Sequence, residues 1–270
     1  LEQLPLSSSA PVQRQHLIIE AMRRAYFDRS QYLGDDDFIS VPTARLTSKA
    51  YAKKLISNID PHSATVNNLQ PANITSKGED TTHFSIIDKE GNRVSATLSI
   101  NYPFGSGFIA EGTGVLLNDE MDDFSALAGS ANAYGLIGNT ANAIAANKRP
   151  LSSMSPTFIE NDHHLMIIGT PGGSRIITMV LLGILGFIEG DNAEDIVSQP
   201  RFHHQHSPNK VQFESVGFSA KEREQLKQYG HEIDLLNRQY GNMQVIIKNK
   251  PANQISAASD PRGEGFSDVR

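Results

Sequence analysis

The chain of 270 residues contains no cysteine and no tryptophan. Without cysteine it can form no disulfide, use no thiolate nucleophile and bind no metal through sulfur. It also lacks a strong charge of either sign, because its net charge is -6 and its pI is near 5.8. A nucleic acid or an anionic membrane as main partner would call for a basic face, so the composition disfavours both.

Long hydrophobic runs are also missing. The longest apolar stretch, Ile176 to Ile188, is well short of the roughly 20 residues that span a bilayer, and it predicts a buried helix. We therefore expect no membrane span in this chain. Hydrophobic residues still make up 39% of it, which is enough for the core of one large domain or two small ones.

The part of the chain before Thr81 is predicted to form helices, followed by an irregular linker. Apolar positions follow helical spacing from about Val12 to Leu33, and a second helix is expected from Ser48 to Ile56. The segment 57–80 is rich in Asn, Pro, Ser and Thr without periodicity, which is typical of an exposed linker.

At Thr81 the repeat of apolar residues changes from the 3.6 residues of a helix to the 2 residues of a strand. The pattern predicts a strand from Thr81, a turn at Asp88–Asn92 and a second strand from Arg93. The second strand has one apolar face and one hydroxyl and amide face. Ser99 and Asn101 belong to its polar face, at the end of the hairpin where Thr81 begins.

The remaining elements alternate between strands and helices. They are a hairpin of Pro156–Glu160 with His164–Gly169, the apolar helix, a short helix near Asn192, a helix from Ser219 with a capping box to Gly230, and strands near 231–237, 242–248 and 255–258. The order indicates an α+β fold with two packed sheets flanked by helices.

Thr81 is a candidate nucleophile. A threonine hydroxyl is weak without an adjacent base. If the Asp80–Thr81 bond were cut, Thr81 would gain an α-amine with a pKa near ~8 beside its own hydroxyl. The linker makes that bond reachable, and the strand holds the new terminus. The alternative is that paired threonines merely reflect β-propensity.

The run GTPGGSR (169–175) is a candidate oxyanion hole. Gly172 and Gly173 lie between a strand and a helix start, where backbone N–H groups can converge on one anion. The run lacks the lysine of a phosphate-binding loop, so nucleotide binding is disfavoured. A tight turn that needs glycine for positive φ is the equally weighted alternative.

Two further segments suit an amino-acid head group. NDEMDDF (118–124) offers the carboxylates of Glu120 and Asp123 for an ammonium, and PLSSMSP (150–156) offers the hydroxyls of Ser152 and Ser153 for a carboxylate. Taken singly, an acidic loop is usually solvated and serine beside proline is usually a turn.

The histidines of RFHHQH, which are His203, His204 and His206, do not predict a metal site. Adjacent side chains diverge on a strand, and no carboxylate stands at ligand spacing. We expect no metal and no cofactor.

These segments occur together and in the order of one family. TTHFSIIDKEGN, LLNDEMDDFSA, NKRPLSSMSPT, GTPGGSRIIT and PRFHHQ closely resemble γ-glutamyltransferase (γ-glutamyl transpeptidase, glutathione hydrolase). AYFDRSQYLGDDDF and LTSKAYAKKL resemble the end of that family's large subunit. The resemblance extends over nearly the whole chain from about residue 15, and it favours the nucleophile interpretation of Thr81.

The resemblance implies an N-terminal-nucleophile hydrolase with a four-layer αββα sandwich, incomplete here because the family's large subunit is much longer than the segment 1–80. It implies autocatalytic cleavage at Asp80–Thr81, with residues 1–80 as the large-subunit tail and 81–270 as the small catalytic subunit. Thr81 matches the nucleophile and Gly172 and Gly173 match the oxyanion hole. The other matches are Ser99 and Asn101 beside the nucleophile, Glu120 and Asp123 at the substrate amine, Ser152 and Ser153 at its carboxylate, and Tyr134 in a lid loop.

Two substitutions depart from the family pattern. Ser99 stands where threonine is usual, which keeps the hydroxyl and loses a methyl that would stiffen χ1. His206 stands where tryptophan is common. The family's large subunit also supplies an arginine for the substrate carboxylate that the segment 1–80 does not provide. We therefore expect a chain that is inactive without the remainder of the large subunit, its partner in a heterodimer.

The expected activity is hydrolysis or transfer of the γ-glutamyl group of glutathione and other γ-glutamyl compounds, through a γ-glutamyl ester on Thr81 that water, an acceptor amino acid or a dipeptide resolves. The family is usually exported, so the resemblance implies a periplasmic or secreted protein. The alternatives are a related cephalosporin or glutaryl acylase, a poly-γ-glutamate hydrolase, and an unprocessed fragment with only a structural role. An acylase needs no ammonium site, so Glu120 and Asp123 disfavour it.

Overall fold

The structure is a computed structural model that describes residues 1–66, 81–132 and 134–270, and these residues divide into two compact units. The first unit takes 1–66, 121–132, 134–152 and 202–237, and the second takes 81–120, 153–201 and 238–270. Each unit therefore contains chain from several segments. The predicted division at Asp80–Thr81 concerns a covalent cut, and it stays a prediction. Asp80 and most of the predicted linker lie outside the described residues.

The first unit is built around α1 (Pro11–Tyr32), which begins with proline at a position where its missing N–H is no loss. One face of this helix is buried, as the predicted helical spacing required. The short helix α2 (Thr43–Leu46) was not predicted. The expected second helix is α3 (Lys49–Ile56), whose cap Ser48 accepts the N–H of Tyr51.

A three-stranded sheet completes the first unit. Its strands are β7 (Phe202–His203), β8 (Val211–Glu214) and β9 (Ile233–Leu236), with β7 antiparallel and β9 parallel to β8. The helix α6 (Ala220–Gln228) has the predicted capping box at Ser219. The rings of Phe202, Phe213 and Phe218 form an aromatic cluster with centroids 4.7–5.9 Å apart.

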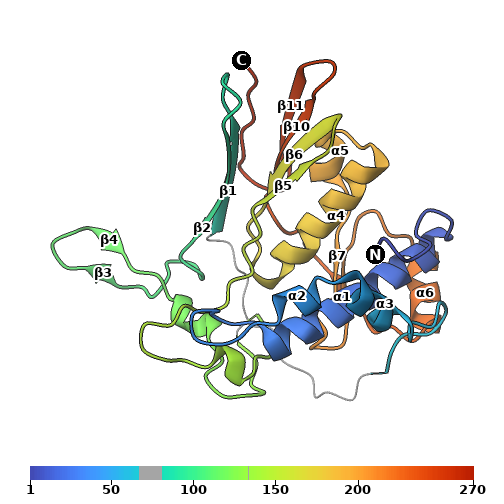
Figure 1. The fold of residues 1–270 in the computed structure, drawn as a ribbon, viewed down its shortest axis with the longest axis horizontal. Helices are drawn as coiled ribbons and strands as arrows, with labels where there is room; N and C mark the ends of the chain where they lie inside the picture. The colour runs from blue at the N-terminus through green and yellow to red at the C-terminus, as the bar shows by residue number, and fades with distance from the viewer. Residues whose placement is uncertain (67–80, 133) are drawn as a thin grey trace. The chain divides into compact units, whose positions relative to one another are not determined.

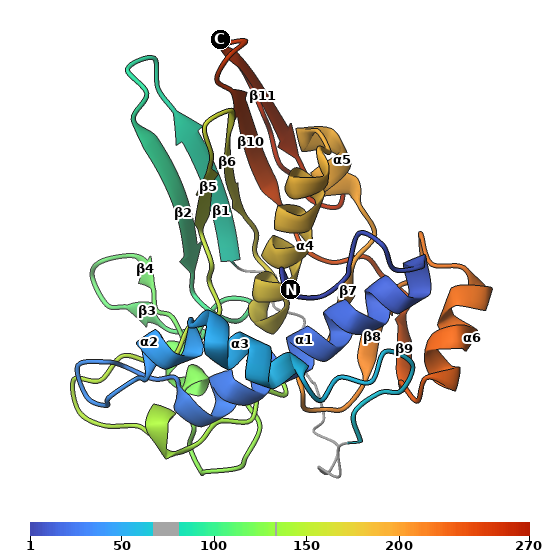
Figure 2. The same ribbon diagram turned by 45° about the vertical axis from the view of Figure 1, so that its right-hand side comes forward.

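The second unit contains a four-stranded antiparallel sheet in the order β11-β10-β6-β5. Its strands are β5 (Thr157–Glu160), β6 (His164–Gly169), β10 (Gln244–Asn249) and β11 (Gln254–Ser259). The helices α4 (Ile176–Glu189) and α5 (Ala193–Ser198) cover one face of this sheet (Figures 1 and 2). The apolar run is thus a buried helix, as predicted.

A hairpin lies on the opposite face of the sheet, where β1 (Thr81–Ile87) pairs with β2 (Arg93–Ser99). The register sets Thr81 opposite Ser99, so the predicted hairpin and its polar end are confirmed. Two shorter strands, β3 (Ile109–Ala110) and β4 (Val115–Leu116), form a small separate hairpin within the glycine-rich region.

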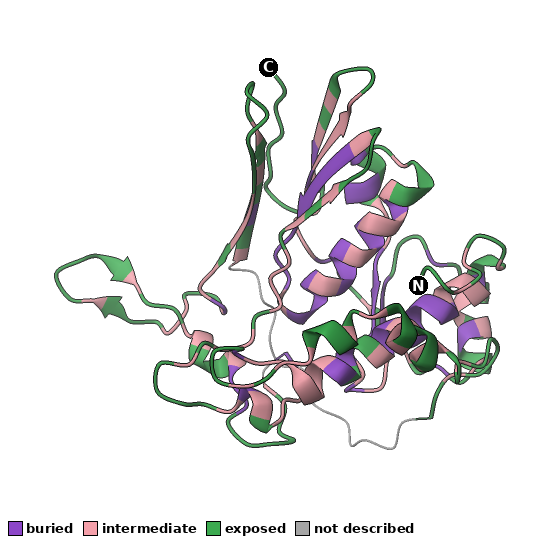
Figure 3. Ribbon diagram, in the orientation of Figure 1, coloured by how far each residue is buried: buried purple, intermediate pink, exposed green. Residues whose placement is uncertain are grey.

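The polar face of the β1–β2 hairpin is the one that packs against the sheet. His83 on this face is only 6% exposed, whereas Phe84 and Ile86 on the other face are 42% and 49% exposed. Figure 3 shows the contrast between the green and pink hairpin and the purple of β6 and α4. The hairpin therefore contributes polar side chains to the interface with the four-stranded sheet.

Within the part of the chain that the structure describes, we find no helix that combines the length and the apolar character required to traverse a lipid bilayer.

Candidate active site

Thr81 is the first residue of β1, and its hydroxyl meets that of Ser99. The two oxygens are 2.9 Å apart, directly across the hairpin. The Ser99 oxygen also accepts the backbone N–H of Asn101 at 2.8 Å, which leaves its own proton available for Thr81. Asn101 adopts φ 72°, is 4% exposed, and donates its side-chain amide to the carbonyl of Asp119 at 3.3 Å. The structure thus brings together three of the predicted residues.

The loop after β6 has the backbone shape that the glycines predicted. Gly172 has φ 143° and Gly173 has φ 57°, both in the region that favours glycine. A Cβ on Gly172 would lie 2.5 Å from Cε of Met179. A 3-10 turn, η3 (Gly173–Arg175), leads directly into α4, so the loop is followed by the N-terminal end of a helix.

Thr81 and Gly172 line one cavity of about 430 Å³ in the second unit. Arg175, Arg238 and Arg262 also line it, together with the loop at Tyr240 and Gly241. Arg175 lies over the ring of Tyr240, with 5.1 Å from its guanidinium carbon to the ring centroid. Thr81 and one glycine of the loop thus line the same cavity, and acyl transfer by a hydroxyl needs a nucleophile and an oxyanion-binding group beside one substrate.

Glu120 and Asp123 lie in one 3-10 turn, η1 (Glu120–Asp123), with Glu120 assigned to the second unit and Asp123 to the first. In the first unit Asp123 lines a small pocket of about 70 Å³ with Arg29 of α1, and the two side chains interact electrostatically. Sequence reasoning did not single out Arg29. Its signal was its place in AYFDRSQYL, one of the segments that resemble the family.

Ser152 and Ser153 are neighbours in the sequence that are assigned to different units. Ser152 is exposed in the first unit, where its carbonyl accepts a long hydrogen bond of 3.5 Å from Arg29. Ser153 belongs to the second unit, and its carbonyl accepts the hydroxyl of Ser155 at 3.0 Å. The predicted lid residue Tyr134 is 4% exposed, and its carbonyl accepts from Gln205 at 2.9 Å. The roles of all three stay predictions.

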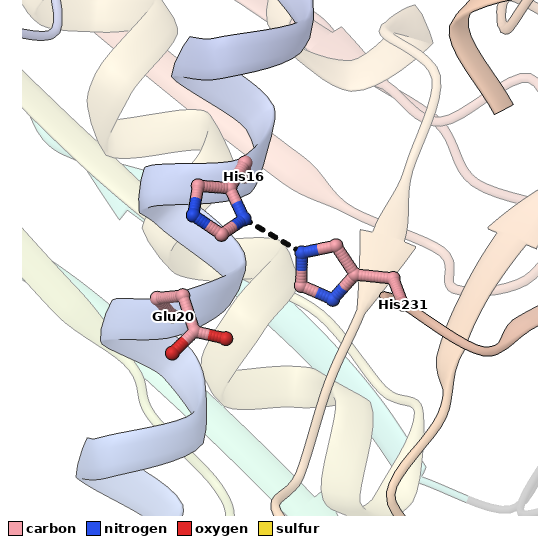
Figure 4. Close-up of side chains that lie close together, drawn as sticks. All are labelled: His16, Glu20 and His231. Carbon is pink, nitrogen blue, oxygen red and sulfur yellow. Dashed lines mark hydrogen bonds between the residues drawn. The ribbon is translucent and has the colours of Figure 1, made fainter. Parts of the chain in front are cut away.

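A buried cluster in the first unit joins His16 and Glu20 of α1 to His231 (Figure 4). His16 Nε2 donates to the carbonyl of Asp60 at 2.8 Å, so Nδ1 of His16 accepts from Nε2 of His231, also at 2.8 Å. Nδ1 of His231 then has no partner among the described residues. Burial lowers the pKa of His231 to about 4, helped by His16 and Arg23.

Glu20 carries the charge of this cluster. Burial raises the pKa of its carboxyl, but the opposing effects of Arg23, Thr65 and Arg24 are larger together and lower the pKa to about 2. Its oxygens accept from Arg23 at 3.0 Å and from Arg24 at 2.6 Å. Because two guanidinium groups and Thr65 already occupy this carboxylate, the donor set does not fit a metal ion.

The histidines of RFHHQH have local partners. His203 and His204 are 1% and 0% exposed, and their Nε2 atoms hydrogen-bond to Gln205 at 2.8 Å and to Asn209 at 3.3 Å. The backbone N–H of His206 donates to Nδ1 of His204 at 3.0 Å. These contacts hold the turn that follows β7.

Comparison with known families bears on the whole chain. The family model described as Gamma-glutamyltranspeptidase matches residues 1–269. The chain belongs to this family. The mixed α/β structure has the N-terminal-nucleophile hydrolase fold of its structural neighbours, as the resemblance implied.

Individual relatives agree with this assignment. The chain is 48% identical over 245 residues to a glutathione hydrolase proenzyme of Pseudomonas sp. (strain A14), a match covering 90% of this chain and 40% of the relative. It is 44% identical over 250 residues to the glutathione hydrolase proenzyme of Escherichia coli (strain K12), covering 91% and 43%. The chain thus spans less than half of these relatives.

A solved structure of acivicin-inhibited gamma-glutamyltranspeptidase is 43% identical to this chain, with a TM-score of 0.65. The match covers 68% of this chain and 100% of the solved chain.

Proposed function

We propose that this chain carries the nucleophile of a γ-glutamyltransferase, or glutathione hydrolase, and that Thr81 becomes the nucleophile when the Asp80–Thr81 bond is cut. The observation that carries the proposal is the placement of Thr81. In a chain of this family, its hydroxyl lies 2.9 Å from that of Ser99, and Thr81 lines the same cavity as Gly172.

The cleavage step needs only groups of the chain and water. Oγ1 of Thr81 attacks the carbonyl carbon of Asp80, the C–N bond breaks, and the resulting ester is hydrolysed. The products are the carboxylate of Asp80 and the free amine of Thr81. This amine, with a pKa near ~8 in an ordinary α-amino group, can accept the proton of the Thr81 hydroxyl at neutral pH.

In turnover, Oγ1 of Thr81 attacks the γ-carbonyl of glutathione. The backbone N–H groups at Gly172 and Gly173 stabilise the oxyanion, and the leaving cysteinylglycine amine receives the proton that the Thr81 amine took up. Water or an acceptor amine then attacks the γ-glutamyl ester and restores the threonine hydroxyl. Asp123 and Glu120 would hold the substrate ammonium, and Ser152 and Ser153 its carboxylate.

We infer that activity requires the remainder of the large subunit, as a heterodimer partner that would supply an arginine for the substrate carboxylate. The relatives named glutathione hydrolase, at 44–48% identity, favour γ-glutamyl substrates over the acylase alternative. We also expect export to the periplasm or the cell exterior, which fractionation of the source cells would test.

The test is a pair of variants at adjacent threonines, measured in the assembled enzyme. Thr81→Ala should abolish both the cut at Asp80–Thr81, followed by intact mass, and the turnover of glutathione. Thr82→Ala removes a hydroxyl from the exposed side of the same strand and should keep both. Turnover by Thr81→Ala would refute the proposal.

A further inference from the structure

His83 lies two residues after Thr81 on the same face of β1. Its Nδ1 is 2.8 Å from the hydroxyl of Thr97, directly opposite on β2, and its Nε2 is 3.1 Å from the hydroxyl of Ser85. With 6% of its surface exposed, the ring has both nitrogens engaged in a buried site. The two hydrogen bonds fix the ring plane relative to the strand that carries Thr81.

The ring of His83 lies against the backbone of Gly169. A Cβ at this glycine would lie 2.2 Å from Cε1 and 2.3 Å from Nδ1 of the ring, closer than any real side-chain contact. Gly169 is the last residue of β6 and comes three residues before Gly172. Its lack of a side chain therefore lets the strand of the nucleophile approach the base of the predicted oxyanion loop.

The contacts of His83 do not support a role for its ring in proton transfer. Burial lowers its pKa to about 4, so the ring is neutral at neutral pH. Its nitrogens bond to Thr97 and Ser85, while the hydroxyl of Thr81 bonds to Ser99. What the ring does is fill the space between β1 and the end of β6.

We propose that His83 is a positioning residue, whose ring on Gly169 sets the distance between Thr81 and the oxyanion loop at Gly172. The inference rests on the proposed function, in which both groups must act on one carbonyl. A misplacement of about 1 Å is enough to lower a rate by about 100-fold. The contact should accordingly affect the chemical step more than substrate binding.

The test is a double-mutant cycle on the assembled enzyme, with a γ-glutamyl anilide as substrate. Gly169→Ala places a methyl group into the ring and should lower kcat by at least about tenfold while KM stays within about twofold. In a His83→Ala background the ring is gone, so the same Gly169→Ala change should lower kcat by less than about twofold. An equal loss in both backgrounds would overturn the proposal.

Two further variants keep the test decisive if Gly169→Ala does not fold. His83→Phe retains a flat ring over Gly169 and should keep more kcat than His83→Ala; the reverse order would contradict the positioning role. Thr82→Ala, on the exposed face of the same strand, is the matched control and should leave kcat unchanged.

A readout without catalysis separates this inference from the proposed function. Thermal unfolding midpoints should show the same coupling in the four proteins of the cycle, which are the native protein, the two single variants Gly169→Ala and His83→Ala, and the double variant. Gly169→Ala should lower the midpoint only when His83 is present. If Thr81→Ala kept its activity, the function would fail while this contact could stand. If the midpoints were additive, the contact would fail while Thr81 could stand.

Discussion

The hydroxyl oxygens of Thr81 and Ser99 lie 2.9 Å apart, at a position where the hairpin register sets the two residues directly opposite each other. The Ser99 oxygen already accepts the N–H of Asn101, so its proton can orient a lone pair of Thr81. The relationship depends on the register, because a slip of one residue would turn Ser99 to the other face.

Ser99→Ala should therefore lower kcat by about five- to tenfold, the equivalent of one hydrogen bond of about 1–1.5 kcal/mol. Ser99→Thr, which keeps the hydroxyl, should keep kcat at or above the native value. Steady-state kinetics of the assembled enzyme measures both. If Ser99→Ala turned over at the native rate, the Ser99 contact would have no part in the reaction.

Asp123→Asn should raise KM for glutathione by about 10- to 100-fold, because it removes a charge-assisted contact of about 1.5–3 kcal/mol to the substrate ammonium. The kcat at saturation should change much less. Asp122→Asn removes the same charge from the adjacent residue and is the control. An unchanged KM for Asp123→Asn would remove this residue from the substrate site.

Glu20→Gln should destabilise the first unit by about 3–5 kcal/mol, since it leaves Arg23 and Arg24 without their shared carboxylate in a buried place. Glu224→Gln, at an exposed carboxylate 3.8 Å from Lys227, should change stability by less than about 1 kcal/mol. Denaturant unfolding compares the two. Equal midpoints would show that the Glu20 cluster contributes nothing to folding.

Stability should fall as the pH drops from about 6.5 to about 4. The pKa values of His83 and His231 are lowered to about 4 from the model-peptide value of 6.5, so the unfolded chain takes up protons first on acidification. The contribution of each histidine to the free energy of unfolding is fully present above about pH 6.5, and it is at most about 3 kcal/mol. Glu20, whose pKa is about 2, extends the loss below pH 4.5.

Thermal unfolding across this pH range measures the effect. His231→Gln should flatten the slope between pH 6.5 and 4, and His163→Gln, at an exposed side chain, is the control. A native protein with constant stability over this range would contradict the burial argument.

Much of the fold could be predicted from local patterns. The helix starting at Ser219 was predicted from its capping box, and the hairpin at Thr81 from alternation around the Asp88–Asn92 turn. Both signals act within a few residues and survive in tertiary context. The site residues Thr81, Ser99 and Asn101 came together because the hairpin register is itself local.

What could not be predicted depends on partners distant in the chain. The strands β7 and β8 are short, and β8 was not predicted from the sequence. The parallel pairing of β8 with β9 is the usual one for two strands joined by a helix, here α6, but it can be inferred only once β8 is recognised. The alternation of β2 does not say which face is covered, and here the covered face is the polar one. The contact of His83 with Gly169 joins two strands that are far apart in the chain, and only the packing of the hairpin on the sheet reveals it.

We propose that the hydroxyl of Thr81 acts with its own free amine as base. The most direct measurement is to treat the assembled, mature enzyme with an electrophilic γ-glutamyl analogue and to locate the modification by peptide mass spectrometry. We predict one label per active site, on Thr81 as the N-terminal residue of its fragment, and none on Thr82 or Ser99. A label on another side chain, or full activity in a chain still joined at Asp80–Thr81, would contradict the account.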